Sequence, residues 1–226
     1  MRLLALDTTT NSGSVAILED GRLVAEVDSE TSASHSARLL RSIDHLMRLA
    51  SWDIKDVDGY AAAAGPGSFT GIRVGLSTIK ALAFASGRPV AAVSSLLALA
   101  EKLKDTGGRL LCPLIDAKKG EVYGALYELA DGRLKVIIPQ GVYAPDAFLA
   151  RFPARRTIHF LGTGAETYGQ KIRSRFRGRA RFPDRSLFIA REVGVLGGRV
   201  LAKGGGVRGE ALEPIYFRKS QAEERK

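Results

Sequence analysis

The sequence is poor in cysteine and histidine. Cys112 is the only cysteine, so neither an intrachain disulfide nor a cysteine-based zinc site can form, which is typical of a reducing compartment. The histidines are His35, His45 and His159, and none of their spacings is typical of metal ligands. We therefore predict no metal site in this chain.

Long apolar runs are also missing. The longest, VAAVSSLLALA at 90–100, is far short of the roughly 20 residues of a membrane-spanning helix. The N-terminal stretch MRLLALD is too short for the apolar region of a signal peptide. The sequence therefore predicts a cytoplasmic protein with no membrane partner.

Peptidase motifs are absent as well. The sequence contains neither HExxH nor GxSxG, the patterns typical of zinc peptidases and of serine hydrolases. We predict no catalytic residue of either class.

Positive charge is abundant but unevenly distributed. The formal net charge is +10, and residues 151–191 hold eleven Lys or Arg against Glu166 and Asp184. Arginines stand at alternate positions, which on an extended chain would line one face: Arg173, Arg175, Arg177, Arg179 and Arg181. This segment is either a contact for the phosphate backbone of a nucleic acid or a solvated surface.

The first half of the chain alternates strand and helix patterns. An Asp20-Gly21 pair between two apolar runs is typical of a β-hairpin. Gly87, followed by Pro89, is typical of a helix C-terminus. The predicted strands are 2–7, 14–19, 22–27, 57–64 and 89–93, and the predicted helices are 36–50, with Ser34 or Ser36 as N-cap, 68–86 and 94–104. This order predicts an α/β fold with a mixed sheet covered by helices.

The opening pattern recurs about 110 residues later. Asp7 aligns with Asp116, Gly13 with Gly120, and the string DGRL at 20–23 with DGRL at 131–134. After this hairpin the pattern shortens to a helix at 145–151, a strand at 157–162, and helices at 166–175 and 186–202. We predict two duplicated lobes, 1–106 and a smaller, abbreviated 107–226, with the last helix a candidate to pack back on the first lobe.

This duplication resembles the actin, hexokinase and Hsp70-like ATPase fold, which is built from two ribonuclease H-like lobes. The resemblance implies that the loops after Asp7 and Asp116 hold nucleotide phosphates and a metal. Backbone amides must approach phosphate closely, so glycine is expected inside both loops. Here Thr8 and Thr9 follow Asp7, and Lys118 stands in the second loop. Asp7, Thr8, Thr9 and Asp116 are therefore either phosphate-binding residues or residues that only cap local turns.

The stretch GPGSFTGIRVGLSTIK at 65–80 has a glycine-rich start. It matches neither the P-loop, which needs Lys-Ser/Thr after its last glycine, nor the dinucleotide-binding pattern. Gly71 and Gly75 lie one helical turn apart, and each costs about 1 kcal/mol relative to alanine. Together with Ser68 and Thr78 they predict a strip of small residues that another backbone approaches, either helix 36–50 of this chain or a second protein.

Several segments together resemble the bacterial TsaB family, also called YeaZ: LALDTTTNSGSVAI, HSARLL, GPGSFTGIRVGLSTIKALA, VSSLLALA and EPIYFRK. The resemblance implies a non-catalytic partner of the TsaD enzyme, which with the ATPase TsaE forms N6-threonylcarbamoyladenosine in tRNA. It also implies a homodimer in isolation. The implied interface, for self-association and for TsaD, contains His35, Leu39, Ile43, Ser68, Gly71, Ile72, Gly75 and Thr78.

Two functions therefore stay open. The first is a scaffold and activator that needs no cofactor of its own, with ATP or ADP expected only at the partner interface. Under this hypothesis Gly75→Leu leaves the monomer folded and abolishes association. The second is a stand-alone ATPase or kinase that uses Asp7 and Asp116.

Overall fold

The computed structural model describes residues 1–10, 12–29 and 35–218 and divides into two compact units. Unit 1 consists of Met1–Ala98 and Phe188–Tyr216. Unit 2 consists of Leu99–Leu187, joined by Phe217 and Arg218 near the end of the described chain. The structure therefore changes units inside a helix, α3 (Ser95–Lys102), and not after it as the sequence suggested. The reason is that Leu99 already packs beside Gly162 of unit 2.

Unit 1 is built on a five-stranded mixed sheet with strand order β3-β2-β1-β4-β5. β1 pairs antiparallel with β2 and parallel with β4, and the turn between β2 and β3 contains the predicted Asp20-Gly21 pair. The strands are β1 (Arg2–Asp7), β2 (Gly13–Glu19), β3 (Arg22–Ser29), β4 (Gly59–Gly65) and β5 (Val90–Ser94). All five lie within two residues of the predicted ranges.

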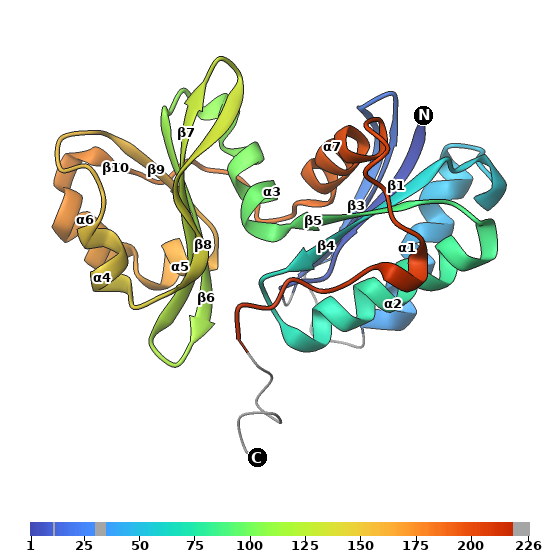
Figure 1. The fold of residues 1–226 in the computed structure, drawn as a ribbon, viewed down its shortest axis with the longest axis horizontal. Helices are drawn as coiled ribbons and strands as arrows, with labels where there is room; N and C mark the ends of the chain where they lie inside the picture. Colours follow the sequence, from blue (N-terminus) through green and yellow to red (C-terminus); the bar gives the residue numbers. More distant parts are fainter. Residues whose placement is uncertain (11, 30–34, 219–226) are drawn as a thin grey trace. The chain divides into compact units, whose positions relative to one another are not determined.

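Helices cover both faces of this sheet, as Figure 1 shows. α1 and α2 pack on one face and α7 on the other. The sheet residues alternate accordingly: Leu4 and Leu6 belong to the core under α1 and α2, whereas Leu3 and Ala5 face glycines of α7. The helices are α1 (His35–Leu49), α2 (Phe69–Ser86) and α7 (Ala190–Leu201), with short 3-10 turns η1 (Ile54–Asp56) and η4 (Gly209–Ala211).

Unit 2 repeats the topology of unit 1. Its sheet has the order β10-β9-β6-β7-β8, so the hairpin β6-β7-β8 stands where β1-β2-β3 stands in the first sheet. The strands are β6 (Leu110–Lys118), β7 (Glu121–Ala130), β8 (Arg133–Tyr143), β9 (Ile158–Leu161) and β10 (Ala180–Arg181). The duplication is confirmed, and so is the abbreviation, since β9 has four residues and β10 two.

Short helices and aromatic side chains form the core of unit 2. The rings of Phe148 and Phe152 meet edge to face with centroids 4.8 Å apart, and Phe152 continues to Phe160 and Phe176. The elements are α4 (Pro145–Ala150), α5 (Thr163–Thr167), α6 (Gly169–Phe176), and the 3-10 turns η2 (Lys104–Thr106) and η3 (Arg177–Arg179). The helix expected at 166–175 is thus two helices, and the last helix begins at Ala190.

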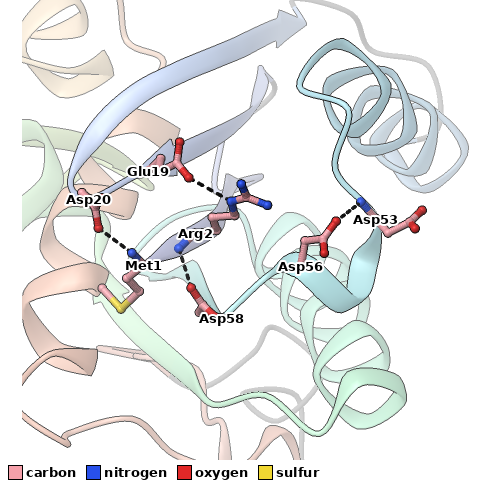
Figure 2. A network of polar contacts seen from close by, with 7 residues as sticks. All are labelled: Met1, Arg2, Glu19, Asp20, Asp53, Asp56 and Asp58. Atoms are coloured by element: carbon pink, nitrogen blue, oxygen red, sulfur yellow. Dashed lines mark hydrogen bonds and ion pairs between the residues drawn. The ribbon is translucent and has the colours of Figure 1, made fainter.

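A polar network fixes the start of β1 (Figure 2). The Met1 ammonium group donates to Asp20 at 2.5 Å, in the turn after β2. Arg2 donates through its backbone to Asp58 at 2.8 Å and through Nε to Glu19 at 2.9 Å. The guanidinium group of Arg2 also lies over the Trp52 ring, 5.0 Å from its centroid. The chain end therefore holds together β2 and the segment that leads into β4.

Candidate functional site

The loop after β1 is folded on itself around Asp7. Asp7, Thr8 and Thr9 are each 1% exposed. One carboxylate oxygen of Asp7 accepts from the backbone N–H of Thr9 at 2.8 Å and from its hydroxyl at 2.6 Å. This is an Asx turn, in which the side chain replaces a backbone partner. The amide and hydroxyl of Thr9, which a phosphate would need, are thus already bound to Asp7.

The N-terminus of α2 closes over the same loop. The hydroxyl of Thr8 donates to the carbonyl of Gly71 at 2.7 Å, and the backbone N–H of Ser68 donates to the carbonyl of Thr9 at 2.6 Å. Ser95 donates to the Thr9 hydroxyl at 3.3 Å. The loop is therefore held from α2 and from α3.

This contact explains the two helical glycines. A Cβ at Gly71 would overlap the carbonyl oxygen of Thr8, and a Cβ at Gly75 would overlap the hydroxyl of Thr8 and lie 2.9 Å from a methyl group of Leu6. The backbone that approaches the strip belongs to this chain, and it is the β1–β2 loop, not helix 36–50. The interface prediction for Gly71 and Gly75 is wrong, because both positions are sealed inside unit 1.

Three apolar members of the predicted interface are buried as well. Ile72 is 1% exposed, Leu39 6% and Ile43 5%, and all three belong to the core of unit 1. Ser68 is the exposed N-cap of α2, and the half-buried Thr78 donates to the carbonyl of Val74. The side chains of His35 and Ser36, together with Ser34, lie outside the described part of the chain.

Other side chains of the same helices face outward. Phe84 on α2 is 79% exposed, Leu49 on α1 64%, Leu40 on α1 55% and Ile54 on η1 39%. Both α1 and η1 contact α2, so these residues lie on adjoining elements. The sequence did not single out these residues. Helical periodicity identifies the apolar face that packs inward, but it does not show which apolar residues lie outside that face. We call Leu49, Ile54 and Phe84 the outer helix face.

Near the end of β6, Asp116 also bonds to a residue of its own turn. The Asp116 carboxylate accepts from the backbone N–H of Lys118 with one oxygen and from Nζ of Lys118 with the other, each at 2.8 Å. The hydrogen bond to Asp116 raises the pKa of Lys118. Lys118 and Lys119 both have positive φ, 60° and 52°, in the turn where the fold family expects glycine.

Asp7 and Asp116 have the same local role. In both loops, the acidic side chain caps a turn two residues ahead. Among the described residues no cluster of three His, Cys, Asp or Glu could hold a metal ion.

The remaining reactive groups are structural. Burial raises the pKa of Cys112, which lies in the core of unit 2. His159 shares a hydrogen bond of 2.8 Å between its Nδ1 and the hydroxyl of Thr106, and burial lowers its pKa. Within residues 1–10, 12–29 and 35–218, no helix has the length and apolar composition to cross a membrane.

The arginine-rich segment does not form one extended strand, the conformation in which its alternate arginines would line one face. Arg173 and Arg175 lie on α6, Arg177 and Arg179 on η3, and Arg181 on β10. The buried residues Ile172, Phe176 and Ala180 anchor the segment in the core of unit 2. All five arginines are exposed, because the spacing of these anchors, not alternation on a strand, turns them outward.

The C-terminal segment, which the sequence singled out only as part of a motif, contributes residues 215–216 to unit 1 and residues 217–218 to unit 2. Ile215 donates through its backbone to Ala64 at 2.7 Å, and the Tyr216 ring stacks on Phe69 with centroids 5.2 Å apart in unit 1. In unit 2, Arg218 pairs with Glu121 and donates to the carbonyl of Ala117.

Comparisons with known proteins agree with this geometry. The family model described as "TsaD: tRNA N6-adenosine threonylcarbamoyltransferase" matches residues 27–223. The chain is 32% identical over 173 residues to the "tRNA threonylcarbamoyladenosine biosynthesis protein TsaB" of Bacillus subtilis, covering 76% of this chain and 75% of that protein.

Solved structures show the same fold. "YeaZ from Pseudomonas aeruginosa" superposes with a TM-score of 0.81 at 33% identity, covering 95% of this chain and 99% of that one. A ROK hexokinase from Thermus thermophilus superposes with a TM-score of 0.52 at 13% identity, over 89% of this chain and 100% of that one, which shows the actin-like ATPase fold alone.

Proposed function

Because the chain belongs to the TsaB family of tRNA threonylcarbamoyladenosine biosynthesis proteins, we propose that it is a non-catalytic scaffold and activator subunit. It self-associates and docks the catalytic TsaD paralogue, which acts with TsaE in the cytoplasm. The proposed docking surface is the outer helix face defined above.

Exposure of Phe84 is the observation that carries the docking proposal. Phe84 is 79% exposed on α2, whose other large apolar side chains are buried or half-buried. Phe84, Leu49 and Ile54 are all apolar and outward-facing, and such groups on adjoining elements mark interaction surfaces. Large aromatic anchors contribute most of the free energy of binding at protein interfaces.

The non-catalytic part of the proposal is supported by the two closed loops. The oxygens of Asp7 and Asp116 that would face a metal or phosphates accept hydrogen bonds from their own turns. The chain therefore needs no nucleotide of its own in this proposal, and ATP or ADP is left to the junction with the partner subunits. The stand-alone ATPase or kinase hypothesis has no structural observation in its favour.

The docking proposal is tested with a double variant, Leu49→Asp with Phe84→Asp. A carboxylate at an apolar anchor would lose its hydration on binding without gaining a partner. The affinity for purified TsaD and for a second copy of the chain is therefore expected to fall at least about 30-fold, which corresponds to a hot spot of about 2 kcal/mol. Calorimetry measures the first affinity and sedimentation velocity the second.

A matched control replaces two exposed apolar residues of unit 2, Val136→Asp with Ile137→Asp, which are 55% and 43% exposed on β8. This control is expected to bind TsaD normally. Unchanged binding by the first variant, or equal loss in both, contradicts the proposed surface. Magnesium-dependent ATP hydrolysis by the pure chain, abolished in Asp7→Ala, would instead establish the enzyme.

A further inference from the structure

Arginines gather at one edge of the sheet in unit 2. β10 is the edge strand next to β9, and α6 and η3 lead directly into it (Figure 1). Arg173, Arg175, Arg177, Arg179 and Arg181, called the arginine edge here, are exposed along these three elements.

Strand pairing brings a further arginine to this edge. β10 and β9 run parallel with Ala180 opposite Ile158. The residues that precede the two strands therefore lie at the same end of the sheet. Arg155, which is exposed, precedes β9 and so lies at the same end as Arg177 and Arg179, which precede β10.

Carboxylates do not neutralise the arginine edge. Lys171 pairs with Asp146 at 2.7 Å and Arg156 with Glu128 at 2.8 Å. Within the described part of the chain, no carboxylate lies within ion-pair distance of the five arginines of the edge. Uncompensated like charges repel one another, and a polyanion relieves that repulsion.

Three of the guanidinium groups are held in place by the protein. Arg173 lies over the Phe182 ring, 4.2 Å from its centroid. Arg175 donates through Nε to the carbonyl of Leu149 at 3.1 Å, and Arg181 donates to the carbonyl of Gly178 at 2.6 Å. A guanidinium group has five N–H donors, so each keeps donors for a phosphate. Ordering before binding lowers the entropy lost on binding.

The composition of the edge favours a nucleic acid over a membrane. Ten of the eleven cations in residues 151–191 are arginine, and arginine binds phosphate with two parallel hydrogen bonds. Peripheral membrane sites combine cations with exposed apolar side chains that insert among the lipids. None of the large exposed apolar residues of the described chain falls within residues 151–191.

We infer that the arginine edge binds the phosphate backbone of a structured RNA, without reading its sequence. This binding belongs to unit 2, whereas the proposed docking surface belongs to unit 1, so it goes beyond the proposed function and does not depend on it. Given the family, the RNA is the tRNA on which the complex acts.

The test measures binding of unfractionated bacterial tRNA to the full chain by fluorescence anisotropy between 50 and 300 mM KCl. Sequence-independent binding is expected near the micromolar range at the low salt end, with strong salt dependence. The variant combines Arg177→Gln with Arg179→Gln, since neither side chain makes a hydrogen bond, ion pair or ring contact within the described part of the chain. The slope of log K against log salt should become shallower by about 1.4 to 1.8, as two phosphate contacts are lost.

A control variant removes the same charge from β8 of the same unit, Arg133→Gln with Lys135→Gln, at two exposed positions. It should keep the wild-type slope. The inference is overturned by absent tRNA binding at 50 mM KCl, by an unchanged slope in the first variant, or by equal loss in the control. It is also overturned if vesicles of phosphatidylcholine and phosphatidylserine bind with the same arginine dependence while tRNA does not. Retained tRNA binding by the Leu49→Asp and Phe84→Asp variant would separate this surface from the docking surface.

Discussion

The hydroxyl of Thr8 donates to the carbonyl of Gly71 across 2.7 Å, and no room remains between this loop and α2 for a side chain at position 71. The fold family uses such loops to hold phosphate. In this chain the N-terminal turn of α2 and the loop after β1 are hydrogen-bonded to each other. The same contact explains why glycine stands at positions 71 and 75.

Gly71→Ala is expected to destabilise unit 1. The added methyl group meets a backbone carbonyl, which cannot move aside as a flexible side chain does, so overpacking of about 1–3 kcal/mol or more exceeds the gain of about 1 kcal/mol from helix propensity. Urea unfolding measures the difference. Ser77→Ala, at an exposed position of α2, is the control and should be neutral or stabilising.

The same packing argument predicts a larger effect for Gly75→Leu. The sequence alone suggested a folded monomer that fails to associate, whereas the structure predicts a chain that does not fold, because Leu6 and Thr8 fill the space. A soluble, cooperatively unfolding Gly75→Leu monomer would contradict the packing described here.

Asp7→Ala and Asp7→Asn are expected to differ in stability. Alanine leaves the buried amide and hydroxyl of Thr9 without the Asp7 oxygen, at a cost of about 1–3 kcal/mol, whereas an asparagine side-chain oxygen can still accept. Thermal unfolding with and without magnesium ATP makes the measurement. The proposal assigns no nucleotide to this loop, so magnesium ATP should not shift the midpoint of thermal unfolding of the wild type. A shift that Asp7→Asn abolishes would contradict the structural role of Asp7.

Arg177→Gly is expected to stabilise the protein while weakening RNA binding. Arg177 has φ 50° and ψ −134°, a backbone conformation that glycine adopts far more readily than other residues. Relief of such strain is worth about 1–3 kcal/mol. Arg177→Gln keeps the strain and loses the charge, so it should weaken RNA binding with no gain in stability by urea unfolding. Destabilisation by glycine would show that the arginine side chain holds the turn together.

The N-terminal amine gives a dependence of stability on pH. Its hydrogen bond to Asp20 raises the pKa of the Met1 amine above 8.0 and lowers the pKa of Asp20 below 3.8. A raised pKa means that the protonated amine favours the folded state, so the contribution is complete below pH 8 and is lost as the pH rises through the raised value. The contribution of Asp20 is present above pH 3.8 and is lost as the pH falls through the lowered value.

Asp20→Asn should remove the dependence that the amine contributes, as measured by urea titrations at pH 7 and pH 9.5. The upper pH stays below the pKa of Tyr127, which burial raises to about 12. Asp131→Asn is a matched control, since Asp131 occupies the equivalent turn of unit 2 with the same φ of 50°. An equal pH dependence in the wild type and in Asp20→Asn would contradict the assignment.

Much of the fold could be read from local patterns. The Asp-Gly turns at 20–21 and 131–132, the apolar run of β1 and the cap at Gly87 each depend on neighbours in the sequence. The conformation of the arginine segment could not be read in this way, because alternating charges line one face of a strand only if nothing else anchors the chain. Ile172, Phe176 and Ala180 supply those anchors, at spacings that suit a helix followed by a turn.

The sequence by itself determined the order of strands and helices along the chain, the duplication and the family, because these depend on hydrophobic periodicity, turn residues and motifs that are local in the chain. Only the tertiary structure decided which element approaches Gly71 and Gly75, since Thr8 lies 63 residues before Gly71 and no local pattern relates them. It also decided which apolar residues of α1 and α2 face solvent. Burial depends on what packs against a side chain, and that is settled only when distant segments meet.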